Sequence, residues 1–150
     1  MGVTLDDDAR RYLALFEDVT GADGIDCLPA ESDESARGEA GQDRLIVVVS
    51  SGQMGEAIGP GGRTIQRYED RVDAPVRLVE NAVDPEEFVA NALAPAAVYN
   101  VTISENEDTV AYVEVAEEDR GVAIGSNGRT IEAARTLAKR HCDIDDVQLI

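Results

Sequence analysis

The chain has 150 residues and a formal net charge of −18, from 31 Asp and Glu against 13 Lys and Arg. Hydrophobic residues make up 43% of the chain, close to the usual range of about 45–50% for globular proteins, which excludes wholesale disorder. Four Tyr, two Phe and no Trp are too few for recognition by several stacked rings, and no apolar run approaches the roughly 20 residues of a membrane span.

The first half of the chain predicts a helix, two strands, a short helix, a glycine-rich turn, another helix and a last strand. Apolar side chains recur on one face of the first helix, and residues 45–49 form a run of Leu, Ile and Val typical of a buried strand. Residues 29–43, rich in Glu, Ser, Gly and Asp, predict an exposed loop. The expected elements cover residues 6–19, 24–28, 44–50, 52–58, 59–62, 63–72 and 75–80.

The second half predicts the same order of elements. Asp84 is expected to cap the first helix, and Pro85 suits its first position. Residues 105–108 are expected to connect two alternating strands as a hairpin. The expected elements cover residues 84–93, 98–104, 109–115, 117–124, 125–128, 130–140 and 145–149.

An internal repeat relates the two halves. Residues 55–65 read GEAIGPGGRTI and residues 121–131 read GVAIGSNGRTI, so eight of eleven positions are identical at an offset of 66 residues. A repeat of one supersecondary unit predicts two domains of similar architecture.

The order helix, strand, strand, helix, Gly-x-x-Gly, helix, strand resembles a type II KH domain. Its tandem occurrence around Ala-Ile-Gly-x-x-Gly-Arg-Thr-Ile resembles the NusA family of transcription factors, in particular its short archaeal members. The resemblance implies an α+β fold of two tandem KH type II domains, αββααβ each, packed as one compact unit. We expect KH domain 1 over residues 1–81 and KH domain 2 over residues 82–150.

The resemblance places RNA contact at the two glycine turns and the cations that follow. Glycines let the main chain approach phosphates closely, and helix N-termini favour anions. The cations in each helix lie four residues apart, which places them on one face. The predicted RNA-binding residues are Gly59, Pro60, Gly61, Gly62, Arg63, Arg67, Gly125, Ser126, Asn127, Gly128, Arg129, Arg135 and Lys139.

Two further expectations concern the surroundings of the turns. Ile58 and Ile124 each precede a turn. We expect both side chains to lie beneath the turns and to support them. Residues 120–141 contain five basic residues and one acidic residue, although the protein as a whole is acidic. This local positive charge predicts that the stretch faces RNA.

The function that follows is a non-enzymatic factor that binds single-stranded nascent RNA across both turns and acts in transcription termination or elongation. The alternative is an acidic adaptor with degenerate KH domains that docks a basic partner. Further expected partners are RNA polymerase and other transcription or ribosome-related proteins, with no membrane association.

No catalytic residues, metal or cofactor are expected, and the expected location is cytoplasmic. Cys27 and Cys142 do not form a disulfide framework.

The acidity itself has three interpretations: a surface for basic partners, an acidic tail, or adaptation to molar salt. Acids run from Asp6 to Asp146, so no single tail explains the excess. Twelve Arg against one Lys and few aromatics resemble the composition of proteins from salt-in halophiles.

Adaptation to salt predicts that the fold is lost as salt is removed. Between about 2 M and about 0.05 M KCl the Debye length rises fourfold or more, so repulsion among the carboxylates increases. Circular dichroism across this range should show loss of helix at the low end. An unchanged spectrum would count against adaptation to salt.

Overall fold

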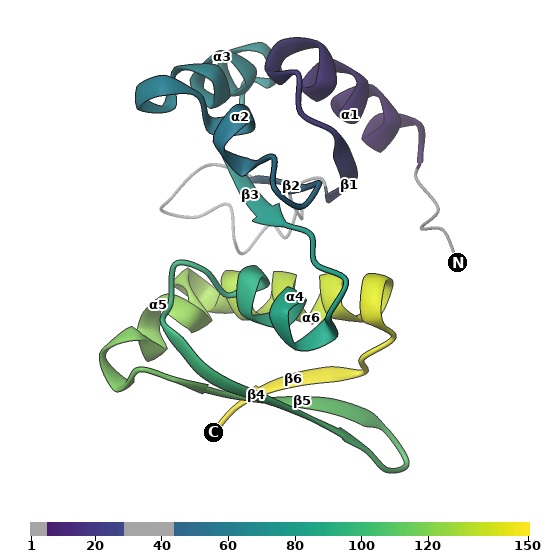
Figure 1. Ribbon diagram of the computed structural model, residues 1–150, viewed down its shortest axis with the longest axis vertical. Helices are drawn as coiled ribbons and strands as arrows, with labels where there is room; N and C mark the ends of the chain where they lie inside the picture. Colours follow the sequence, from purple (N-terminus) through teal and green to yellow (C-terminus); the bar gives the residue numbers. More distant parts are fainter. Residues whose placement is uncertain (1–5, 29–43) are drawn as a thin grey trace. The chain divides into compact units, whose positions relative to one another are not determined.

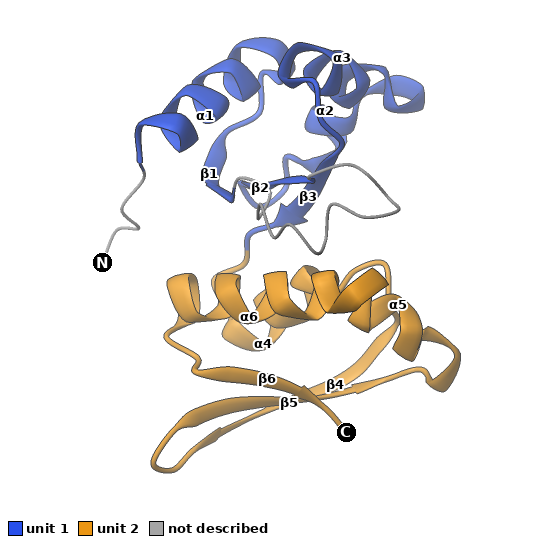
Figure 2. Cartoon of the chain, turned by 180° about the vertical axis from the view of Figure 1, so that it is seen from behind, with its two compact units in different colours: residues 1–81 blue, residues 82–150 orange. Residues whose placement is uncertain are grey.

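The computed structural model describes residues 6–28 and 44–150, and the chain divides into two compact units, residues 1–81 and 82–150. Figure 2 colours these two units separately. The predicted loop over residues 29–43 lies outside the described residues.

In the described part of unit 1, the helices lie on one face of the sheet (Figure 1). The sheet order is β1-β2-β3, with β1 antiparallel and β3 parallel to β2. The predicted order of elements is confirmed. The elements are α1 (Asp7–Thr20), β1 (Gly24–Leu28), β2 (Leu45–Val49), α2 (Met54–Ile58), a 3-10 turn (Pro60–Gly62), α3 (Arg63–Val72) and β3 (Val76–Glu80).

Helix α1 begins and ends where its flanking residues satisfy the backbone. The Asp6 carboxylate accepts a hydrogen bond from the Ala9 N–H at 2.7 Å, which caps the first turn. Gly21 adopts φ +75° and closes the last turn. The predicted helix is therefore shifted by one residue, because Asp6 caps it rather than joining it.

The core of unit 1 is centred on two aromatic rings. Phe16 of α1 and Tyr68 of α3 are fully buried and meet edge to face, with ring centroids 5.1 Å apart. The Tyr68 hydroxyl donates to the main-chain carbonyl of Tyr12 at 2.8 Å. This contact ties α3, the helix after the glycine turn, to α1.

Unit 2 repeats the architecture around a separate core. Its sheet order is β4-β5-β6 with the same strand directions, and Phe88 of α4 and Leu137 of α6 are fully buried. The elements are α4 (Pro85–Ala92), β4 (Val98–Glu105), β5 (Thr109–Val115), a 3-10 turn (Glu117–Asp119), α5 (Arg120–Ile124), a second 3-10 turn (Ser126–Gly128), α6 (Arg129–Cys142) and β6 (Asp146–Leu149).

Most predicted features of unit 2 are confirmed. Asp84 accepts from the Glu86 N–H at 3.2 Å, and Pro85 is the first helical residue. The predicted helix over 117–124 is instead a 3-10 turn followed by α5, and α6 extends to Cys142. Among the described residues, no helix combines the length and apolar character needed to cross a membrane.

Replacing Tyr68 with Phe should destabilise the protein by about 1 kcal/mol, because the Tyr12 carbonyl loses a buried donor. Urea denaturation in molar KCl measures the change. Tyr99→Phe is the matched control, since the Tyr99 side chain is exposed and its loss of a hydroxyl should cost nothing measurable. Equal stability of Tyr68→Phe and the parent would contradict the role given to this hydrogen bond.

Candidate nucleic-acid interface

The turn in unit 1 connects α2 to α3 through three glycines with positive φ. Gly59 ends α2 with φ +75° and ψ 173°, and its N–H donates to the Gly55 carbonyl at 2.9 Å. Gly61 and Gly62 follow with φ +62° and +77°, and α3 begins at Arg63.

The turn in unit 2 has the same backbone to within a few degrees. Gly125 has φ +79° and ψ 169°, Asn127 has φ +57° and Gly128 has φ +74°. Asn is one of the few residues that adopts this left-handed conformation readily, which explains why it replaces a glycine there. The predicted turns are therefore equivalent three-dimensional structures.

The first glycine of each turn is required by packing as well as by conformation. A Cβ on Gly59 would lie 2.1 Å from the Thr64 Oγ1, and one on Gly125 would lie 2.4 Å from the Thr130 Oγ1. Their φ and ψ values also fall in a region that is essentially restricted to glycine. The two buried threonines were not among the predicted site residues, although their identity in both repeat copies is a signal that could have found them.

The middle of each turn faces open space. No atom lies within 4 Å of a Cβ built on Gly61 or Gly62, and Pro60, Ser126 and Asn127 are exposed. The glycines that cap α3 and α6 offer no side-chain acceptor to the first N–H groups of these helices. The Arg63 and Arg129 N–H groups instead donate to the carbonyls of Pro60 and Ser126 in the same turns. The polar groups that the second turn offers to an anionic ligand are the exposed side chains of Ser126 and Asn127.

The expectation for Ile58 and Ile124 is wrong. Both side chains are exposed, at 38% and 40%, while the preceding alanines, Ala57 and Ala123, are fully buried. Successive residues of a helix point about 100° apart, so the alanine packs inward and the isoleucine turns to solvent. Val122 of α5 is also exposed, so each short helix before a turn presents at least one apolar side chain to solvent.

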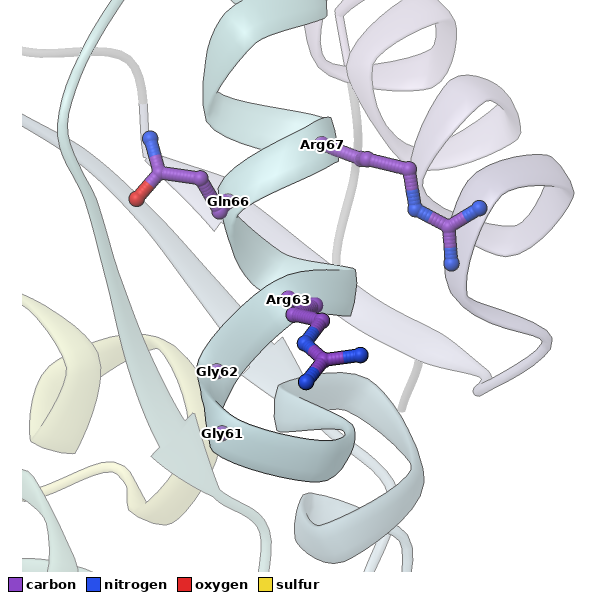
Figure 3. A pocket seen from close by; sticks show the side chains of 5 residues that line it. All are labelled: Gly61, Gly62, Arg63, Gln66 and Arg67. Carbon is purple, nitrogen blue, oxygen red and sulfur yellow. The ribbon is translucent and has the colours of Figure 1, made fainter.

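Beside the first turn lies a recess of about 440 Å³ (Figure 3). Figure 3 shows Arg63 and Arg67 projecting from the same side of α3. Both side chains are exposed. The lining residues are Gly61, Gly62, Arg63, Gln66 and Arg67.

The cations predicted in unit 2 have carboxylate partners within the chain. Arg135 pairs with Glu132 and, through Nε, with Asp146 at 3.0 Å. Lys139 Nζ lies 2.8 Å from an Asp145 oxygen and 3.3 Å from an Asp143 oxygen.

Titration behaviour reflects this pairing. The hydrogen bond from Lys139 lowers the pKa of Asp145, and the same contact raises the pKa of Lys139. The positive stretch at 120–141 is therefore followed directly by the acids that neutralise two of its members.

Neither metal nor thiol chemistry finds support in the described ranges. No group of three or more His, Cys, Asp and Glu side chains there is arranged to hold a metal ion. Cys27 is buried, and burial raises the pKa of its thiol to about 12, which keeps it protonated.

Comparison with known proteins agrees with this architecture. Residues 85–149 match the model of the NusA-like second KH domain. The chain is 56% identical over 149 residues to the probable transcription termination protein NusA of Halococcus morrhuae and 52% identical to that of Halobacterium salinarum, with 99% of each chain covered. The crystal structure of APE1850 is similar with a TM-score of 0.78 and 28% sequence identity, over 97% of this chain and 100% of that one.

The first glycine of the turn provides a stability test. Gly125→Ala should destabilise unit 2 by about 1–3 kcal/mol or more, because the methyl group meets Thr130 and the backbone leaves its permitted region. Gly121→Ala, four residues earlier in α5 with nothing within 4 Å of its Cβ, should instead stabilise by about 0.5–1 kcal/mol. Denaturation of both variants in molar KCl measures the contrast, and equal effects would contradict the packing described.

Proposed function

This chain belongs to the NusA family of transcription termination proteins, and on that premise we propose that it binds single-stranded nascent RNA through its two glycine turns. The family comprises transcription factors and not enzymes, so the protein acts by binding and positioning RNA during termination or elongation. The observation that carries the proposal is an exposed left-handed turn, built twice, at the start of a helix.

The surroundings of each turn suit a nucleic-acid strand. Each turn lies at the N-terminal end of a helix, where the helix dipole favours phosphate, and KH turns clamp a backbone of about four nucleotides. In this arrangement Arg63 and Arg67 supply positive charge after the first turn, and Arg129 follows the second turn at the position equivalent to Arg63. The exposed Ile58 and Ile124 provide apolar surface next to the phosphate site, against which a base can pack.

Family membership also supports the choice of partners and location. The relatives are named for transcription termination, so we place the protein in the cytoplasm with the transcription machinery and expect contact with RNA polymerase or nascent transcripts. A pull-down with and without ribonuclease separates the two modes of association. Partners that survive the nuclease would support a protein adaptor, the alternative favoured by the uncharged interior of the first turn.

The double variant Gly61→Asp, Asn127→Asp should abolish RNA binding without unfolding the chain. Asp tolerates the left-handed conformation, and positions 61 and 127 are both exposed, so the fold should be kept. The added carboxylates face the phosphates, and like charges in contact cost several kcal/mol, enough to raise Kd by about a hundredfold or more. Fluorescence anisotropy in molar KCl, with circular dichroism as a check of folding, measures the effect.

Gly61→Asn is the matched control for this experiment. It has nearly the shape of the Asp variant without its charge, and it copies the residue that occupies the equivalent position in unit 2. It should bind RNA like the parent protein. Full binding by the double Asp variant would overturn the proposed function.

A further inference from the structure

The cations of the two units occupy different positions on equivalent helices. At the repeat offset of 66 residues, Arg63 corresponds to Arg129, but Arg67 corresponds to Ala133. In the other direction, Arg135 corresponds to Glu69. Apart from the shared first arginine, the basic residues of α3 and α6 therefore lie at different positions, and they need not have the same role.

Glu69 in unit 1 and its equivalent Arg135 in unit 2 each connect a helix to the strand that follows it. The Glu69 carboxylate accepts from the main-chain N–H of Val76, the first residue of β3, at 2.7 Å. Arg135 Nε pairs with Asp146, the first residue of β6, and donates to the Val147 carbonyl at 3.1 Å. The charge is reversed between the units, but the connection made is the same.

The other cations of residues 120–141 are also engaged within the chain. Lys139 is held by two carboxylates after the end of α6, and Arg120 donates to the Ile150 carbonyl at 2.8 Å. Arg129 is half-buried, and it and Arg140 have interactions of their own. An anion that bound these side chains would compete with contacts already present.

Unit 1 presents the opposite situation. The Arg63 and Arg67 side chains are exposed, and neither makes an ion pair or hydrogen bond within residues 6–28 and 44–150. Both project from one side of α3 (Figure 3) beside the recess at the first turn. A phosphodiester backbone can take up both guanidinium groups without breaking an existing contact.

We propose that the two turns hold RNA by different physical means. Unit 1 holds phosphates by charge through Arg63 and Arg67, whereas unit 2 holds RNA by the uncharged, exposed side chains of its turn, with Arg135 and Lys139 serving the junction of α6 and β6. This inference rests on the proposed function and adds to it the division of labour between the units. Its consequence is that the salt dependence of RNA binding originates in unit 1.

The test measures Kd for fluorescein-labelled, single-stranded RNA of random sequence as a function of KCl concentration. Each phosphate neutralised on a single strand contributes about 0.7 to the slope of log K against log salt. Arg63→Gln with Arg67→Gln should therefore reduce the magnitude of that slope by about 1.4. Measurements are restricted to salt concentrations at which circular dichroism shows each variant folded.

Two comparison variants remove equal charge elsewhere. Arg10→Gln with Arg11→Gln removes cations that pair with Asp7 and Asp8 on α1, and should leave the slope unchanged. Arg135→Gln with Lys139→Gln should lower the melting temperature and keep the slope. Where that pair fails to fold, Lys139→Gln alone provides the comparison, since this side chain is exposed.

The outcomes separate this inference from the proposed function. If the parent protein binds RNA and the unit 2 variant flattens the slope as much as the unit 1 variant, the division of labour is overturned while RNA binding stands. An unchanged slope for Arg63→Gln with Arg67→Gln also overturns it. If the parent protein binds no RNA at any salt concentration, the proposed function fails and this inference fails with it.

Discussion

In each unit the chain passes from one helix to the next through a glycine whose backbone angles are closed to other residues, with a threonine hydroxyl in the space that a Cβ would occupy. This close approach of Gly59 to Thr64, and of Gly125 to Thr130, determines where the second helix begins. The cap position is another glycine, and the first N–H group of that helix donates to a carbonyl of the turn. A packing constraint thereby fixes a turn whose two middle residues are exposed.

The rest of each unit holds that turn in place. The edge-to-face contact of Phe16 with Tyr68 and the hydrogen bond to Tyr12 anchor α3 to α1. In unit 2 the equivalent helix is anchored by Leu137 and by the Arg135 contacts at the start of β6. A turn that is already held in one conformation costs little to immobilise when a ligand arrives, which suits the proposed binding of RNA.

The net charge of −18 and the screening by salt limit which groups of this protein can attract a phosphate. At about 1 M salt the Debye length is about 3 Å, so a phosphate is attracted only by groups that nearly touch it. Many cations of this chain are already held by carboxylates or carbonyls, while Arg63 and Arg67 stand exposed beside the turn. Short-range donors and a few available guanidinium groups suit a binding site that works in a screened, acidic protein.

The sequence by itself determined the repeat, the order of elements and the two glycine turns, because these follow from local periodicity, capping residues and the restricted angles of glycine. It also indicated the start of α4, with Asp84 as the cap and Pro85 as the first helical residue, which depends only on neighbouring residues. The tertiary structure decided which cations remain available. Lys139 pairs with Asp145, and Arg135 pairs with Asp146, only because the chain reverses at Asp143 after α6 and continues into β6. It also decided that Ile58 and Ile124 face solvent, since the inward side of a five-residue helix is set by what packs against it.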